Sequence, residues 1–403
     1  MAQGHTDNHS TEIKNPGSWK LESSTRGIFI GMAVVGIVGL VASIILSPVR
    51  GWSALLMNHF FFMSLALGGL FITSIQYVTN AMWSAPVRRI AESFSAYLPV
   101  VLVGFLIICL GIPHLFSWSH SEIVQGDPVL EHKASYLNVT FFVIRNLVAI
   151  AVWFLLGRKL VGNSVAQDAD GNPVYTLRNR VLSGAFIVLF ALTYTMSSID
   201  LLMSLDPHWF STMFGVYAFA GLFTSSLALL TIFTIVLLRK GLLKGIVNDN
   251  HLHDLGKFMF AFTIFWAYIA FSQYMLIWYA NLPEETMYFM HRFDGGWKGI
   301  TIFLLLGKFL VPFFALLPRE AKRDAGRLMK VAIWILFAQW IDLIWIIQPE
   351  FFKDGPKIGF PEVAGLLAFG GIFCLMVTRF LGTHNIVAIK DPKLAESVLH
   401  HHQ

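Results

Sequence analysis

Charged residues are scarce in this chain of 403 amino acids: only 13% are Asp, Glu, Lys or Arg, whereas 56% are hydrophobic. Soluble globular domains carry about 25% charged residues, so this composition excludes an ordinary soluble domain. The net charge of +5 does not indicate nucleic acid as a partner, because the basic residues lie in short segments between apolar runs. The sequence therefore predicts a protein that lies mostly in lipid.

Cysteine is nearly absent as well. Cys109 and Cys374 are the only two, both lie inside apolar runs, and the chain has no CxxC or CxxCH motif. A disulfide framework, an iron–sulfur site and covalent haem attachment are therefore unsupported. Stacked haems need histidine pairs at matching depths, and only His59 and His114 are candidates. We expect no haem or iron–sulfur cluster on this chain, so a redox role requires a diffusible carrier such as quinone and another subunit that takes the electrons.

Long apolar runs are what the chain has instead. A membrane span needs about 20 apolar residues, and its backbone must satisfy its own hydrogen bonds. The runs are continuous rather than alternating, which excludes a barrel of strands. The sequence predicts an all-α polytopic membrane protein of about ten transmembrane helices. The expected spans are 27–47, 53–79, 94–116, 138–160, 181–204, 212–238, 256–280, 297–317, 328–349 and 361–381.

The segments between the spans are too short to hold a separate domain. We expect an N-terminal tail at 1–26 that orders only on a partner, a transmembrane domain at 27–381 and a C-terminal tail at 382–403. The longest loops are expected near 117–137, 158–180 and 239–255.

The order of the spans favours an internal repeat. Spans 2 to 5 and spans 6 to 9 begin from the same side of the membrane. Gly69-Leu70-Phe71 in span 2 is echoed by Gly221-Leu222-Phe223 in span 6. We interpret the two groups as a parallel pair of four-helix bundles, with spans 1 and 10 at the periphery.

The distribution of basic residues predicts the topology. Cytoplasmic loops carry an excess of Lys and Arg, and most of the 29 basic residues lie in the two tails and the even-numbered loops. Both termini are therefore expected in the cytoplasm. The basic residues on the other side are Arg50, Lys133, Arg292, Lys298, Lys353 and Lys357.

Ionisable residues within spans are the main functional signal, because each costs about 2.5–3.5 kcal/mol at the middle of a helix on an insertion scale. Their positions in the spans place them toward the outer half of one bundle. The residues within spans are His59, Arg145, Asp200, Lys308 and Asp342, with His114 near the end of span 3 and Asp206 and His208 in the loop after span 5.

Milder polar side chains follow the same helices. Thr193, Ser197, Asp200 and Ser204 form one stripe on span 5, and Gln339 lies one turn from Asp342. A second stripe on span 7 holds Tyr268, Ser272 and Tyr279, with Gln273 adjacent. These stripes predict a hydrated path that hands protons to the outer cluster. The expected proton-transfer residues are Asp200, Asp342, Lys308, Arg145, Gln339, Tyr194 and Ser197.

Packing offers an alternative explanation for each of these signals. The two acids and two bases within spans are also explained by two ion pairs whose role is to hold the helices together. His59 alone suits a hydrogen-bonded packing residue, and Ser and Thr stripes are common where helices pack.

Three segments resemble a known family. They are Ser204-Leu205-Asp206-Pro207-His208-Trp209-Phe210-Ser211-Thr212-Met213-Phe214-Gly215 after span 5, Gly307-Lys308-Phe309-Leu310-Val311-Pro312-Phe313 in span 8, and Asp391-Pro392-Lys393 near the end. The chain resembles the NrfD-like membrane subunits of bacterial alternative complex III, most of all the F subunits labelled quinone-binding subunit 2. The number of spans and the side of the termini agree with this resemblance.

The resemblance implies a subunit of a quinol:cytochrome c oxidoreductase in the bacterial inner membrane. The implied partners are an iron–sulfur protein, haem c subunits and a second NrfD-like subunit, with cytochrome c or a terminal oxidase reached through the complex. The implied ligand is menaquinone or ubiquinone. Candidate quinone-binding residues are His59, His114, Asp206, His208 and Gln273.

Within that function, oxidation of a quinol releases two protons, which gives the outer cluster a task. We expect Asp200 and Asp342 to carry protons, with Arg145 and Lys308 holding their charge. No residue is identified as catalytic with certainty. Two other functions fit the same residues: an ion-coupled secondary transporter, and a structural subunit whose buried charges serve assembly.

Overall fold

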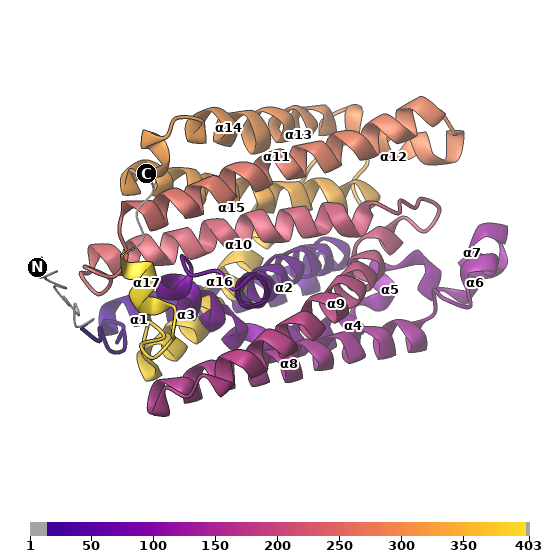
Figure 1. The fold of residues 1–403 in the computed structure, drawn as a ribbon. Coiled ribbons are helices and arrows are strands. Elements are labelled where there is room, and N and C mark those ends of the chain that lie inside the picture. The colour runs from indigo at the N-terminus through magenta and orange to yellow at the C-terminus, as the bar shows by residue number, and fades with distance from the viewer. Residues whose placement is uncertain (1–13, 400–403) are drawn as a thin grey trace, which may run out of the picture.

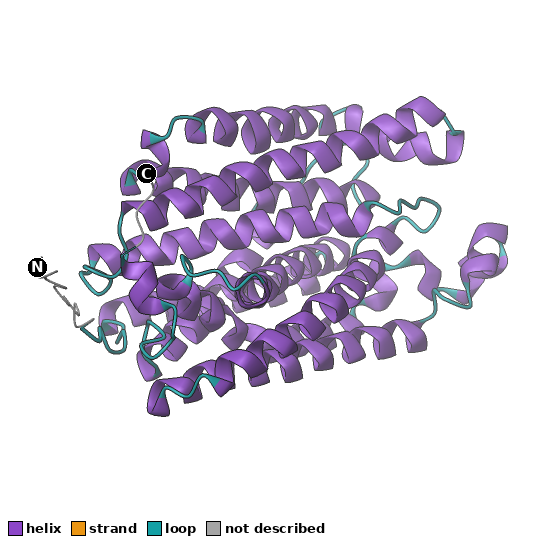
Figure 2. Ribbon diagram, in the orientation of Figure 1, coloured by secondary structure: helices purple, strands orange, loops and turns teal. Residues whose placement is uncertain are grey.

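The computed structural model describes residues 14–399, and every regular element in that range is a helix (Figures 1 and 2). Ten helical segments are long and apolar enough to cross a membrane, so the predicted polytopic all-α fold is confirmed. The ten segments are Ser23–Leu46, Pro48–Val78, Ala85–Leu110, Val139–Asp170, Val174–Leu205, Phe214–Arg239, Asp249–Ala280, Trp297–Leu316, Ala325–Glu350 and Phe360–Thr383.

Eight of these segments form two four-helix bundles. The first bundle contains α2 (Pro48–Val78), the third span with α3 (Ala85–Ser93) and α4 (Leu98–Leu110), α8 (Val139–Asp170) and α9 (Val174–Leu201). The second bundle contains α10 (Phe214–Arg239), α11 (Asp249–Ala280), the eighth span with α13 (Trp297–Phe303) and α14 (Val311–Leu316), and α15 (Ala325–Ile347). Figure 1 shows α8 and α9 on one side of the molecule and α11 to α15 on the other.

The two bundles meet through their first helices, α2 and α10. Phe71 on α2 packs edge-on against Phe223 on α10, with 5.2 Å between the ring centroids. These two residues end the echoed Gly-Leu-Phe segments of the sequence. The contact therefore joins equivalent positions of the two bundles, as a parallel repeat requires.

The remaining spans, α1 (Ser23–Leu46) and α16 (Phe360–Thr383), pack against each other and lie beside α2. Their backbones approach closely, because a Cβ atom on Gly36 would lie only 2.1 Å from the backbone nitrogen of Ala368. Small residues allow this close approach where lipid provides no hydrophobic drive between helices. The expectation of two peripheral spans is confirmed as a tightly packed pair.

Several expected boundaries are wrong. Span 7 begins at Asp249 rather than at 256, so α11 takes up the end of the predicted loop 239–255. The predicted loop 158–180 is largely helical, since α8 continues to Asp170 and α9 begins at Val174. Gly171, with a φ of 72°, ends α8 in the left-handed conformation. Span 3 begins at Ala85 rather than near 94, because Pro86 starts α3 instead of separating two helices.

The first and last described residues of the chain lie at one end of the bundles, here called the termini end (Figure 1). The described parts of the predicted tails pack on the membrane domain: Trp19 is buried and donates its backbone N–H to Leu381, and Ile386 donates to Gly17. The C-terminal helix α17 (Leu394–Val398) packs on α3. Residues 1–13 and 400–403, including the predicted tail histidines His400 to His402, lie outside the described residues.

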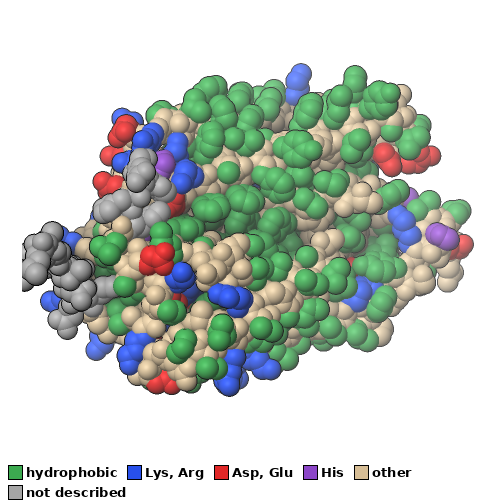
Figure 3. Space-filling view, in the orientation of Figure 1, with side chains coloured by type: hydrophobic (Ala, Val, Ile, Leu, Met, Phe, Trp, Pro, Cys, Tyr) green, Lys and Arg blue, Asp and Glu red, His purple; other side chains and the backbone are tan. Residues whose placement is uncertain are grey.

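The opposite end, here called the far end, carries four short helices. They are α5 (Ile112–Leu115), α6 (Ser121–Gln125), α7 (Pro128–Lys133) and α12 (Pro283–Phe293). Lys and Arg side chains gather at the termini end, and hydrophobic side chains cover the face between the two ends (Figure 3). This pattern is typical of a protein whose middle is surrounded by lipid.

Candidate functional site

Four of the ionisable residues within spans form two ion pairs, one in each bundle. Arg145 on α8 pairs with Asp200 on α9, and Lys308 in the eighth span pairs with Asp342 on α15. The structure therefore divides between two bundles the residues that we expected in one. In both bundles the base lies on the third helix and the acid on the fourth. The first pair lies toward the far end, and in the second pair Asp342 lies in the half toward the far end while Lys308 is near the middle of its span.

The second ion pair, Lys308–Asp342, sits within a group of polar and aromatic side chains. The Lys308 ammonium donates to Asp342 Oδ2 at 2.6 Å and to Gln339 Oε1 at 2.8 Å. It also lies 4.0 Å from the centroid of the Trp266 ring, a cation–π contact. The other carboxylate oxygen accepts a hydrogen bond of 2.5 Å from the Tyr217 hydroxyl. Asp342 is therefore held between a cation and a phenol.

A π-helical turn, Leu304–Leu310, presents Lys308 to this group. In a π turn the N–H of residue 312 would bond to the carbonyl of Gly307, but Pro312 has no N–H to donate. The Trp334 indole N–H supplies the missing bond to the Gly307 carbonyl at 2.6 Å. The sequence around Lys308, with Gly307 before it and Pro312 after it, thus explains why the helix widens here.

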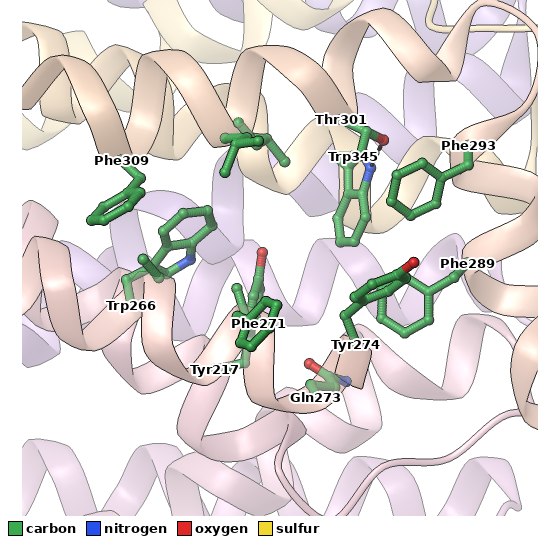
Figure 4. Close-up of a pocket in the computed structure, with 14 residues that line it drawn as sticks. Tyr217, Trp266, Phe271, Gln273, Tyr274, Phe289, Phe293, Thr301, Phe309 and Trp345 are labelled. Atoms are coloured by element: carbon green, nitrogen blue, oxygen red, sulfur yellow. Dashed lines mark hydrogen bonds between the residues drawn. The ribbon is translucent and has the colours of Figure 1, made fainter. Parts of the chain in front are cut away.

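An aromatic cavity of about 160 Å³ lies between α11, α12 and α13 in the far half of the second bundle. Figure 4 shows Tyr217, Trp266, Gln273 and Trp345 among the side chains that surround it. Its lining includes Phe271 and Leu305, which are exposed on the surface that faces lipid. The cavity therefore opens sideways toward the bilayer, and Tyr217 connects its wall to Asp342.

Gln273 is the one predicted quinone-binding residue in this cavity. Its amide is buried and forms no hydrogen bond with other residues of the range 14–399. The rest of the predicted stripe on span 7 faces the opposite way, since Tyr268 and Tyr279 are 64% and 81% exposed. The stripe was therefore a wrong interpretation, because the inward face of α11 carries Gln273 and Trp266 instead.

A second, enclosed cavity of about 10 Å³ lies behind Asp342, between α2, α10 and α15. This volume is close to the smallest that holds one water, about 10–15 Å³. Ser64, Ser225, Gln339 and Asp342 line it. Ser64 is also 3.0 Å from the Tyr194 hydroxyl, so a chain of polar groups runs from Tyr194 across the bundle interface to Asp342.

The first ion pair, Arg145–Asp200, is buried and densely hydrogen-bonded. Arg145 donates to both Asp200 oxygens at 3.0 and 2.9 Å, and Asn146 donates to Oδ2 at 3.0 Å. The guanidinium also donates to the Tyr136 carbonyl and stacks over the rings of Tyr136 and Phe141. This arrangement matches the alternative of an ion pair that fixes helices. Ser197, on the same helix as Asp200, is buried and its hydroxyl has no partner in the described chain.

The two predicted histidines have different surroundings. His59 is buried with neither ring nitrogen hydrogen-bonded within the described chain, and it faces Gly104 on α4 and Phe369 on α16. His114 on α5 is exposed and stacks near Trp52. Neither lines the aromatic cavity.

Asp206 and His208 lie in the loop between α9 and α10 at the far end. Asp206 accepts backbone N–H bonds from His208 and Trp209, and so shapes the loop. His208 bonds to Asp127 at 2.5 Å, and this bond holds the pKa of the Asp127 carboxyl below its usual value. The loop is thereby tied to α7, and these two residues do not reach the cavity of the second bundle.

Sequence reasoning missed the aromatic members of the site. The sequence search looked for charged residues within spans, because burying a charge is costly. Tyr217 and Trp266 carry no charge, so that search did not select them. The sequence prediction also placed Arg88 and Arg89 in a loop, whereas both are buried on α3. There Arg89 pairs with Glu92 and Asp168, and Arg88 pairs with Asp391. The C-terminal segment therefore helps to neutralise a buried charge cluster at the termini end.

Compared with models of known protein families and with curated proteins, the sequence matches none of them.

Proposed function

We propose that the chain is a membrane subunit of a quinol:cytochrome c oxidoreductase of the alternative complex III type, and that quinol binds in the aromatic cavity of the second bundle. One observation carries the proposal: Tyr217 lines a cavity open to lipid and donates to Asp342, which Lys308 holds on its other side. A proton acceptor thus stands directly behind a site that a lipid-soluble molecule can enter.

The cavity suits a quinol better than a polar solute. Its walls are mainly aromatic and aliphatic, as ligand pockets for flat rings usually are. The side opening allows an apolar tail to remain in the bilayer while the ring enters. Tyr217, Gln273 and Tyr274 provide polar groups within these walls, and the Gln273 amide has hydrogen-bonding capacity to spare.

Oxidation of a quinol to a quinone releases two electrons and two protons. In the proposed reaction the Tyr217 hydroxyl accepts a hydrogen bond from a quinol O–H while it donates its own proton toward Asp342. Tyr217 and Asp342 together then move the two protons away from the ring one after the other, the second after Asp342 has passed the first on. Lys308, itself bonded to Gln339, steadies the carboxylate that receives them. The electrons pass to a partner subunit that carries iron–sulfur clusters, as the family resemblance implies.

Protons leaving Asp342 have a polar route toward the first bundle. The enclosed cavity behind Asp342 is large enough for about one water and reaches Ser64, whose hydroxyl meets Tyr194. Hydroxyl groups and water both accept and donate hydrogen bonds, which proton relay requires. This route joins three residues of the predicted path, namely Tyr194, Gln339 and Asp342.

The proposed location is the bacterial inner membrane, with the termini end in the cytoplasm. Support comes from the excess of Lys and Arg in the tails and the even-numbered loops. The cavity then lies in the periplasmic half of the membrane, on the side of the expected iron–sulfur and haem c partners.

The test compares two tyrosine variants in the complex purified from its native membrane. Tyr217→Phe removes the hydroxyl between cavity and Asp342, and quinol:cytochrome c turnover should fall about tenfold or more. Tyr279→Phe, on the exposed face of α11, is the matched control and should keep the wild-type rate. Mass spectrometry of the purified sample should identify iron–sulfur, haem c and second membrane subunits. Wild-type turnover in Tyr217→Phe would contradict the quinol site.

The π turn at Lys308 favours one other function. Secondary transporters often place an interrupted helix and a charged residue near the membrane midplane, and Leu304–Leu310 is such an interruption. A transporter would work as an isolated chain. Ion-dependent solute uptake by the purified chain in vesicles, with no co-purifying redox subunit, would support this function and contradict the first.

A further inference from the structure

A groove of about 310 Å³ lies near the termini end of the first bundle, far from the aromatic cavity. Its walls come from the start of α4, the second half of α8 and the end of α16. Leu98, Pro99, Phe154 and Phe380 give it an apolar surface, and Arg158 and His384 are its basic members. Pro99 and Gly162 in its lining are exposed, so the groove opens on the side of the protein.

Arg158 differs from the buried arginines of the spans. Arg88, Arg89 and Arg145 are buried and each has a carboxylate partner. The exposed Arg158 guanidinium forms no hydrogen bond and no ion pair with other residues between 14 and 399. It lies where the apolar run of span 4 gives way to polar residues, the depth at which lipid phosphates meet a membrane protein.

His384 lies on the other wall of the groove. Its ring stacks on Phe380, with 4.4 Å between the ring centroids, and its Nδ1 is bonded near the end of α16. These contacts fix the ring beside the groove. A rigid aromatic wall, an arginine with no partner and an apolar floor thus meet at the basic end of the protein.

We propose that this groove binds an anionic phospholipid of the surrounding bilayer. The headgroup phosphate pairs with Arg158 beside His384, and the acyl chains run along the apolar wall made by Leu98, Pro99 and Phe154. The opening toward the bilayer and the apolar walls favour a lipid over free phosphate. The net positive charge of this end of the protein favours an anionic lipid over a zwitterionic one.

Gly162 gives the groove its depth. A Cβ atom at this position would meet nothing within 4 Å, so the space in front of it is open. A larger side chain here would fill the groove without removing a charge. A substitution at Gly162 therefore distinguishes binding in a shaped groove from general attraction between basic residues and anionic lipid.

The experiment titrates the purified full-length chain in detergent with short-chain phosphatidylglycerol and follows binding by native mass spectrometry. Arg158→Gln should weaken binding about fivefold, the effect expected for one basic residue at the membrane surface. Gly162→Leu should weaken it at least as much by occupying the groove. Lys159→Gln removes the neighbouring exposed charge, which does not line the groove, and should leave binding unchanged.

Three outcomes would overturn the proposal. Equal binding of short-chain phosphatidylcholine would show that charge is not recognised. An equal loss in Lys159→Gln and Arg158→Gln would show general surface attraction. Inorganic phosphate that competes fully at the same concentration as the lipid would show an anion site without a lipid. Melting temperatures of the variants without added lipid should match the wild type, which excludes misfolding as the cause.

Discussion

The first and second ion pairs occupy equivalent places in the two bundles but have different surroundings. Asp200 receives both arms of the Arg145 guanidinium and the Asn146 amide. A cavity of about 230 Å³ is lined by the neighbouring Tyr136 but not by Asp200 itself. Asp342 receives a lysine and a tyrosine, with the aromatic cavity in front of the tyrosine and a small cavity behind. The comparison teaches that the same pairing of charges fixes helices where side chains enclose the carboxylate, and is available for chemistry where the carboxylate itself lines a cavity.

The choice of base sharpens the difference. Arginine stays charged under all ordinary conditions and grips a carboxylate with two parallel bonds. Lysine is a single point of charge that releases its proton more readily when buried. The first bundle carries the base suited to permanent pairing, and the second carries the base that tolerates a change in its partner's charge.

The largest effect is expected from Asp200→Asn. This change leaves the buried Arg145 charge without its counter-charge, and breaking a buried pair costs about 3–5 kcal/mol. The yield of assembled protein should fall to a small fraction of wild type, as measured by size-exclusion chromatography of the solubilised membrane. Removing both charges in Arg145→Met with Asp200→Leu should restore much of the yield. A stable Asp200→Asn protein that loses only turnover would break the comparison.

The same substitution in the second bundle should act on rate. Asp342→Asn removes the proton acceptor behind Tyr217, and loss of such a group lowers rates about 100-fold. Assembly should survive better than in Asp200→Asn, because a buried lysine can release its proton when its counter-charge is lost, whereas an arginine cannot. Quinol:cytochrome c turnover per assembled complex is the measurement, with the exposed Asp294→Asn as control. An unchanged rate would leave Asp342 a structural residue like Asp200.

A smaller effect is expected in the wall of the cavity. Gln273→Leu removes an amide that has no partner in the described protein, so stability should not change. If that amide bonds to quinol, KM should rise about fivefold with little change in kcat, the loss of about one hydrogen bond. Steady-state kinetics at varied quinol concentration measure both constants. A lower kcat at constant KM would contradict a role of Gln273 in quinol binding and would indicate a role in proton transfer.

The smallest effect is expected behind Asp342. Ser64→Ala interrupts the chain of hydroxyl groups toward Tyr194, while a water in the enclosed cavity can still bridge part of the gap. Proton release per electron pair should slow by about two- to threefold, while electron transfer under uncoupled conditions stays near wild type. Ser74→Ala, a buried serine farther along the same helix, is the control. Equal slowing in both variants would exclude a specific route through Ser64.

The sequence predicted the spans and all four charged members of the two ion pairs, but not which charge meets which. Hydropathy is local, so ten spans could be read directly from it. Pairing of Lys308 with Asp342 depends on how α15 packs against span 8, and no local pattern in the sequence encodes that packing. Tyr217 could not be singled out, because aromatic residues make up 14% of the chain. Pro86 misled the boundary of span 3, since a proline that starts a helix looks like one that ends it.

The close pairing of α1 with α16 has a consequence for biogenesis. The ribosome delivers the first span long before the last, and eight further spans must be inserted before the partner of α1 exists. Gly36 and its neighbours therefore meet lipid, or a temporary substitute, for most of the time that synthesis takes. The backbone bonds from Trp19 to Leu381 and from Ile386 to Gly17 then close the chain end to end. The fold of this protein is thus complete only when its final span is inserted. A truncation near the C-terminus would therefore leave α1 at the beginning of the chain without its packing partner.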